Sequence, residues 1–120
     1  MFNDLKILHT ASLLARHSVE RHTQIAENIA NADTPGYKAK DVEAFSEAFA
    51  RNEQKIANGA ASTAFRAERV EIPGISSPNG NTVSLEDQMS RSTAATRDHD
   101  TALTIYSKTL SMLRSGLGRR

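Results

Sequence analysis

The chain has 120 residues, of which 24% are charged, and its 15 Lys and Arg nearly balance its 14 Asp and Glu. This near-neutral charge, with only two Tyr and no Trp, argues against a nucleic-acid binder, which usually combines a basic face with stacking aromatic side chains. The absence of Cys excludes disulfides, thiolate zinc sites and Cys nucleophiles. No apolar run reaches the roughly 20 residues that span a bilayer.

The residues that usually fill a protein core are scarce. Leu, Ile, Val and Phe together make up 24 of the 120 residues, whereas the 17 Ala favour helix more than they fill volume. A chain of this length forms one domain. The composition therefore predicts a single helical domain with a thin core, which we expect other subunits to complete.

The first predicted element is a long amphipathic helix that ends in a tight turn. Residues 4–33 contain no Gly or Pro. The residues of one mainly apolar helix face recur at alternating steps of three and four positions, from Leu8 to Ile29. Pro35 disfavours helix at Thr34, and Pro35-Gly36 suits the centre of a type II turn. We therefore assign residues 1–37 to an N-terminal helix and turn.

The middle segment, residues 38–82, has no sustained pattern. We expect a short helix over residues 41–50, capped by Asp41, and a short strand over residues 69–72, where polar and apolar residues alternate. Elsewhere bulky apolar residues are few, and Gly and Pro interrupt any regular period. The prediction is an irregular segment that is partly mobile unless a partner orders it.

The C-terminal part, residues 83–120, is predicted to be a second long helix. Its first residues, Ser-Leu-Glu-Asp at positions 84–87, have the form of a capping box. A heptad pattern of mainly apolar residues then runs from Leu85 to Leu117. Such sustained spacing is typical of a coiled-coil seam.

Together these elements predict an all-α fold in which the two terminal helices pack as an antiparallel, coiled-coil-like pair. Ser18 and His22 of the first helix would then lie near Thr96 and His99 of the second. This polar layer would set the register of the pair, or else these positions are partly solvated and have no such role. The residues predicted to form the helix seam are Leu8, Ala15, His22, Ile25, Ile29, Leu85, Met89, His99, Leu103, Tyr106, Leu110, Leu113 and Leu117.

No arrangement of residues indicates catalysis or a cofactor site. No two of the four His stand three or four positions apart, so the sequence offers no helical metal-binding pair. In Asp98-His99-Asp100 the side chains diverge around a helix, and no Ser lies in a Gly-x-Ser-x-Gly motif. We therefore predict that the chain is not an enzyme and binds no metal, cofactor, nucleic acid or small-molecule substrate.

The most distinctive segment covers residues 28–39, where the first helix ends, and reads Asn-Ile-Ala-Asn-Ala-Asp-Thr-Pro-Gly-Tyr-Lys-Ala. Asn is unfavourable within a helix, so Asn28 and Asn31 need a reason. Their amides would either cap the turn locally or reach the backbone of a neighbouring subunit. In the second case Tyr37, just past the turn, would be a packing anchor.

This segment resembles the N-terminal signature of the bacterial flagellar rod and hook axial proteins, most of all those of the proximal rod. The C-terminal helix, with Tyr106, Leu110 and Leu113, resembles the C-terminus of the same family, and the two regions cover about two thirds of the chain. The resemblance implies that the signature residues pack between subunits: Asn28, Ile29, Ala30, Asn31, Thr34, Pro35, Gly36 and Tyr37.

The resemblance also implies a structural role in the flagellar basal body. Members of this family are exported through the flagellar type III apparatus without a cleaved signal peptide. Their terminal helices then assemble in the periplasm into a rod that transmits torque. The implied partners are further copies, other rod proteins, FliE and the membrane-embedded MS ring. The same heptads would also suit a cytosolic helical adaptor or type III export chaperone that dimerises through them.

Overall fold

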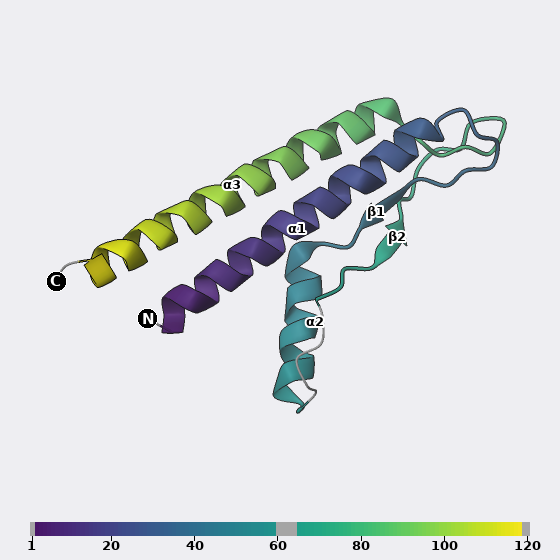
Figure 1. The fold of residues 1–120 in the computed structure, drawn as a ribbon. Helices are drawn as coiled ribbons and strands as arrows, with labels where there is room; N and C mark the ends of the chain where they lie inside the picture. Colours follow the sequence, from purple (N-terminus) through teal and green to yellow (C-terminus); the bar gives the residue numbers. More distant parts are fainter. Residues whose placement is uncertain (1, 60–64, 119–120) are drawn as a thin grey trace.

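The computed structural model describes residues 2–59 and 65–118, and most of these are helical. The elements follow the order α1 (Phe2–Ala30), β1 (Lys40–Val42), α2 (Phe45–Ala57), β2 (Arg69–Glu71) and α3 (Leu85–Gly118). The first turn of α1 and the last turn of α3 lie at the same end of the molecule (Figure 1). In the described part of the chain, no helix combines the length and apolar character needed to cross a membrane.

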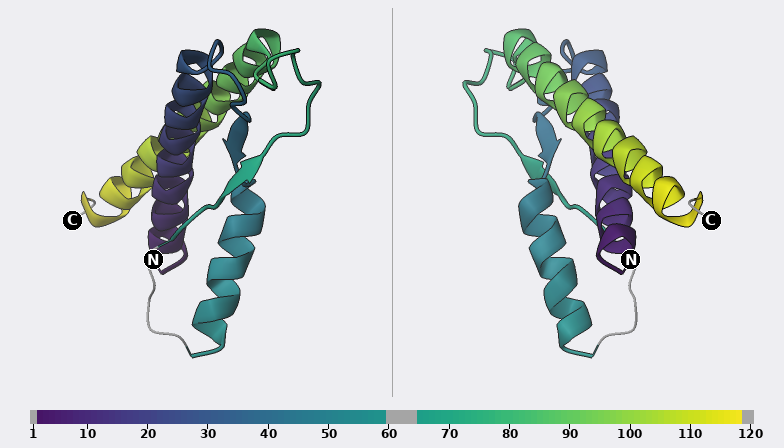
Figure 2. Two further views of the ribbon diagram at one scale, coloured as in Figure 1. Left: turned by 90° about the vertical axis from the view of Figure 1, so that its right-hand side faces the viewer. Right: turned by 90° about the vertical axis from the view of Figure 1, so that its left-hand side faces the viewer.

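The two terminal helices pack together in antiparallel directions, which confirms the predicted helical fold. Asn28 near the end of α1 contacts Gln88 near the start of α3, and His22, earlier in α1, lies 3.4 Å from Thr96. Viewed from the end, α1 and α3 cross at an angle, so that their ends diverge (Figure 2). Close contact is therefore concentrated where the two helices cross.

The face of α3 that packs against α1 is made of small and polar residues. Gln88, Ala95, Ala102 and Thr109 are buried and recur every seven positions. On α1, Ser18 is fully buried and Ile25 is nearly so. Because the side chains at the contact set the distance between helix axes, such small residues allow α1 and α3 to approach closely.

Most of the predicted apolar seam lies outside the centre of this contact, and Ile25 is the one predicted seam residue that is buried. Met89 is 68% exposed and Leu103 is 50% exposed. At about 100° per residue, Leu103 lies roughly 80° around the helix from Ala95, on a flank of α3. The pattern identified a heptad, but close packing selected the small residues and left the large ones outside. Of the predicted seam residues, Ile25 is buried, Leu8, Ala15, His22, His99, Leu110 and Leu113 are half-buried, and Ile29, Leu85, Met89, Leu103, Tyr106 and Leu117 are exposed.

Strands β1 and β2 form a small antiparallel sheet, of which the sequence predicted the second strand but not the first. Asp41 pairs with Val70 in this ladder, and β2 lies within the stretch where a strand was expected. The expected cap at Asp41 is wrong, because Asp41 belongs to β1 and its carboxylate accepts a hydrogen bond from the Val42 N–H at 2.7 Å. The helix begins only at Phe45, where Ala44 precedes it without a side-chain cap. Residues 60–64 of the predicted middle segment lie outside the described residues.

Helix α2 projects from the α1–α3 pair and is attached to it near its first turn (Figure 1). Phe45 and Phe49 stand four residues apart and stack with ring centroids 5.6 Å apart. Phe65 and His17 each approach the Phe45 ring to 5.6 Å. This small aromatic cluster anchors α2 to α1, because it buries apolar surface from both helices and from the segment before β2.

Candidate functional site

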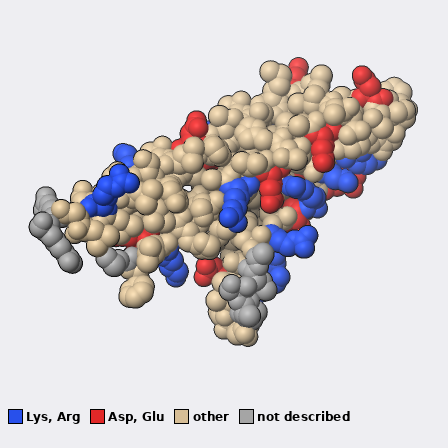
Figure 3. Space-filling model, viewed as in Figure 1, with Lys and Arg blue, Asp and Glu red and all other residues tan. Residues whose placement is uncertain are grey.

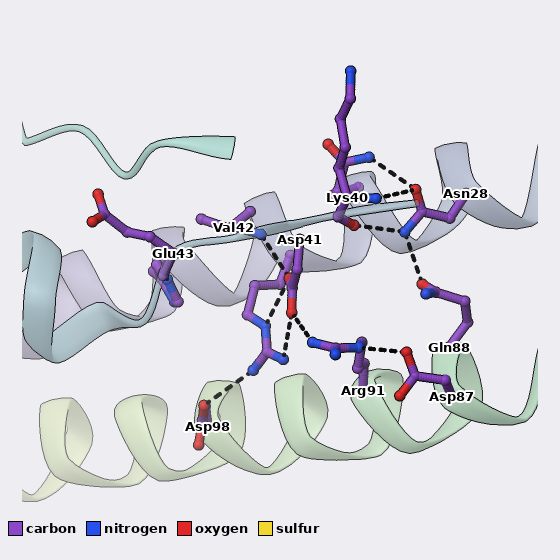
Figure 4. Close-up of polar contacts among 12 residues, drawn as sticks. Asn28, Lys40, Asp41, Val42, Glu43, Asp87, Gln88, Arg91 and Asp98 are labelled. Carbon is purple, nitrogen blue, oxygen red and sulfur yellow. Dashed lines mark hydrogen bonds and ion pairs between the residues drawn. The ribbon is translucent and has the colours of Figure 1, made fainter. Parts of the chain in front are cut away.

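A buried amide joins the end of α1 to β1 and α3. Asn28 is completely buried, and its Nδ2 donates hydrogen bonds to the Lys40 carbonyl at 2.7 Å and to Gln88 Oε1 at 3.0 Å (Figure 4). Its Oδ1 accepts from Gln24 Nε2 at 3.1 Å, from the Tyr37 hydroxyl at 3.0 Å and from the Lys40 N–H at 3.2 Å. Every polar atom of the Asn28 side chain is thus satisfied within the chain.

Beyond α1, a second amide holds the signature turn, residues 31–37. Asn81 is buried, and its Nδ2 donates to the Asn31 and Thr34 carbonyls, both at 2.8 Å. The Asn31 amide donates to the Glu27 carbonyl at 2.8 Å and accepts from the Thr34 hydroxyl at 3.1 Å. Asn31 therefore terminates the helix locally, while Asn81 ties the turn to the segment before α3.

Two glycines let this turn meet the turn before α3. Gly36 has φ of +75° and Gly80 has φ of +85°, a region of backbone conformation that other residues rarely adopt. A Cβ on Gly80 would lie 3.4 Å from the Gly36 Cα. The Gly36 N–H also donates to the Asn79 carbonyl at 2.9 Å. The two turns consequently form one rigid unit at this end of the helix pair.

An ion-pair cluster connects β1 to both long helices. The buried Asp41 carboxylate accepts from Arg21 of α1 at 3.2 Å and from Arg91 of α3 at 2.5 Å. Arg91 also pairs with Asp87 at 2.8 Å, and Arg21 lies 3.9 Å from Asp98 (Figure 4). Because Asp41 has only 8% of its side chain exposed, its pairs with Arg21 and Arg91 are largely shielded from water and fix the position of β1 across the helix crossing.

A second carboxylate fastens the α2 arm. Arg51 of α2 forms a two-pronged pair with Glu43, and the Glu68 N–H donates to Glu43 Oε1 at 2.9 Å. The Arg51 hydrogen bonds are the largest cause that lowers the Glu43 pKa to about 2; burial opposes this effect and the Glu68 N–H reinforces it. The Glu43 carbonyl also lies 2.7 Å from Nε2 of the buried His17. One residue thus connects α1, α2 and the segment before β2.

The predicted signature residues divide into a buried and an exposed set. Asn28 is buried, and the Tyr37 hydroxyl bonds to it; burial, followed by the nearby Glu27 charge, raises the Tyr37 pKa. The Asn28 amide binds β1, α3 and Tyr37 of its own chain, and neither of its two predicted roles, a local cap or a bond to a neighbouring subunit, describes these contacts. The members that remain exposed on the surface are Ile29, Ala30, Thr34, Pro35 and Gly36, whereas Asn31 is half-buried.

The predicted polar layer is only partly assembled. His22 and Thr96 meet at 3.4 Å between Nε2 and Oγ1, at an exposed position. Ser18 is buried, but its hydroxyl donates to the Leu14 carbonyl of its own helix at 3.0 Å. The antiparallel register is as expected, while Ser18 makes no hydrogen bond across the pair among the described residues.

On the side of the helix pair away from β1, an apolar surface is uncovered. A shallow groove between the helices is lined by Val19, His22, Thr23, Ala26, Thr96 and His99. Beside it, Leu85, Met89 and Leu103 occupy the same sector of α3 as Thr96. Figure 3 shows separate charged groups, mainly acidic, among uncharged residues over α3, whereas Lys and Arg gather near the base of the α2 arm. We call these Val19, Ala26, Leu85, Met89 and Leu103 positions the apolar flank.

Sequence reasoning missed several of the residues that position this surface. The pairs Arg21–Asp41, Arg51–Glu43 and Arg91–Asp41 show no local pattern, because their members stand 20, 8 and 50 positions apart. Gln88 could have been found, since a heptad search that includes small and polar residues selects Gln88, Ala95, Ala102 and Thr109. The described residues contain no group of three or more His, Asp or Glu that could hold a metal ion.

Comparison with known proteins singles out the same region. A family model described as "Flagella basal body rod protein" matches residues 25–38, which contain Asn28 and the signature turn. The chain is also 29% identical over 121 aligned positions to the flagellar basal body rod protein FlgB of Aeromonas hydrophila. That alignment covers 92% of this chain and 89% of the relative.

Proposed function

We propose that this chain, which belongs to the family of flagellar basal body rod proteins, is a structural subunit of the proximal rod. The family supports a structural component of the rod and a location in the flagellar basal body, and it is consistent with the prediction that the chain is not an enzyme. The resemblance read from the sequence is confirmed by these comparisons. The finer parts of the proposal concern how the subunit packs and what it contacts.

The observation that carries this proposal is the apolar flank of the helix pair. Met89, Val19 and Leu103 have between 50% and 68% of their surface exposed, although they are large and apolar. Covering such side chains stabilises the assembled state by about 25 cal/mol per Å² of apolar surface removed from water. We propose that helices of neighbouring subunits cover this flank, so that the predicted seam residues pack between chains rather than within one.

The remaining parts of the proposal follow the family. The exposed signature residues, Ile29, Ala30, Thr34, Pro35 and Gly36, would pack against neighbours in the rod. The chain would pass through the flagellar type III export apparatus without a cleaved signal peptide and assemble in the periplasm. Its partners would be further copies, other rod proteins, and FliE and the MS ring at the base. The assembled rod would transmit torque as a drive shaft.

The test is to isolate detergent-resistant basal bodies from the source cell and to quantify this protein in them by mass spectrometry. Several copies per basal body are expected of a rod subunit. Absence from these particles, with the protein recovered in the cytosolic fraction, would reject the rod subunit. That result would instead favour the adaptor or export chaperone that the heptads also suit.

A further inference from the structure

The tip of the signature turn, residues 33–36, is a rigid exposed projection that carries one negative charge. All four residues are exposed, and Figure 1 shows this turn beyond the end of α1. Its backbone is held by the Asn81 amide at 2.8 Å and by the bond from Gly36 to Asn79 at 2.9 Å. Among the residues that the structure describes, Asp33 has no ion-pair or hydrogen-bond partner for its carboxylate. Such a preformed turn loses little conformational entropy on binding.

A groove with an excess of positive charge lies elsewhere on the molecule, between α2 and the segment that leads into β2. It has a volume of about 920 Å³. Arg51 and Arg69 are engaged with Glu43 and Glu20, respectively. Lys55 and Arg66 have no acidic partner within ion-pair distance in residues 2–59 and 65–118. The residues that line the groove are Glu20, Ala48, Arg51, Asn52, Lys55, Arg66, Ala67, Glu68 and Arg69.

We propose that the tip of one copy docks into this groove of a second copy, with the Asp33 carboxylate facing Lys55 and Arg66. This inference rests on the proposed function, because it names a contact between rod subunits. Glu20 and Glu68 in the groove would repel a uniform polyanion such as a nucleic acid or an anionic membrane. A single carboxylate on a turn can instead face the unpaired cations, Lys55 and Arg66. Tip and groove are different surfaces, so the contact is heterologous and can repeat without closing, as an elongated assembly requires.

The first test exchanges the two charges in the full chain and measures its copies per isolated basal body. Asp33→Arg and Arg66→Asp should each lower the recovered amount by roughly tenfold or more, because like charges would face each other. The double exchange should restore it to within about threefold. Glu53→Arg, on α2 but not lining the groove, is the matched control and should change little. Equal loss in the single and double variants would overturn the inference.

The second test uses the absence of natural cysteine to detect the contact directly. Thr34→Cys and Ala67→Cys, placed together in one chain, leave both proposed charges intact. Oxidation of isolated basal bodies should then produce a ladder of covalent multimers, since a disulfide forms only between Cα atoms within about 7 Å. The pair Thr34→Cys and Glu53→Cys should give no ladder. Basal bodies that contain the protein but yield no ladder reject this docking and leave the proposed function standing. Basal bodies that lack the unmodified protein reject both.

Discussion

At the scale of single residues, Asn28 shows why a poor helix former lies near the end of a long helix. Its fully buried amide makes hydrogen bonds to β1, α3, Gln24 and Tyr37. We expect Asn28→Ala to lower the free energy of unfolding by about 3 kcal/mol or more, because several buried groups lose their partner. Chemical denaturation followed by circular dichroism measures this loss.

The neighbouring amide is the natural comparison for that variant. Asn31 is half-buried, and within residues 2–59 and 65–118 its side chain bonds to Glu27 and Thr34 alone. Asn31→Ala should therefore cost about 1 kcal/mol, as expected for a local cap. If both variants lost the same stability, the central role of Asn28 would be wrong.

Glu43 makes the attachment of the α2 arm dependent on pH. Its pKa is about 2 in the folded chain, against 4.5 ordinarily, chiefly because Arg51 hydrogen-bonds to the carboxylate. The folded state therefore binds this proton more weakly than the unfolded state, so the stabilisation is complete above pH 4.5 and is lost as the pH falls toward 2.

The expected result is a thermal midpoint that falls between pH 4.5 and 2 more steeply in the natural chain than in Glu43→Gln. The comparison isolates this carboxylate, since the other acidic groups are common to both proteins. Midpoints measured by circular dichroism across this range provide the test. Parallel curves for the two proteins would show that Glu43 does not contribute this dependence.

At the scale of elements, the α1–α3 crossing depends on small side chains in the inner row of α3. Ala102 is completely buried there, whereas Thr101 beside it is exposed. Ala102→Leu should lower the free energy of unfolding by about 1–3 kcal/mol, because the added atoms would push the helices apart. Thr101→Leu should change it by less than about 0.5 kcal/mol. Denaturant titration of both variants measures this difference, and equal effects would contradict close packing at Ala102.

At the scale of the whole molecule, the proposed interface predicts that folding and assembly use different faces of α3. Leu103 is 50% exposed in the single chain, so Leu103→Asp should leave the helical content of the subunit nearly unchanged. The same change should abolish incorporation into basal bodies, because it would place a charge in a covered apolar contact between subunits. Circular dichroism and motility of the variant strain check the two halves of this prediction.

A second leucine on this helix provides a graded comparison. Leu110 is half-buried, so Leu110→Asp should reduce both the stability of the subunit and its assembly. Normal motility of cells carrying Leu103→Asp would contradict the use of the apolar flank as a subunit interface.

The sequence by itself determined the two long helices and the turn that ends the first. These depend on local signals: residues 4–33 without Gly or Pro, the Pro35-Gly36 pair and the heptads after Ser84. It also revealed the resemblance to flagellar basal body rod proteins, because the segment around Asn28 is a contiguous motif that can be read without knowing the fold. Helix periodicity is a property of neighbouring residues, and for that reason one sequence suffices to predict it.

Only the tertiary structure decided which face of α3 is buried and what the conspicuous polar residues bind. The apolar heptad has the stronger pattern, yet Ala95 and Ala102 form the contact. The sequence could not predict this, because the angle at which two helices cross is not encoded in the periodicity of either one. The partners of Asp41 stand 20 and 50 positions away and meet it only after β1 lies across both helices. Side chains that are brought together by folding have no local spacing to reveal them, so the ion-pair cluster and the groove beside α2 could be seen only in three dimensions.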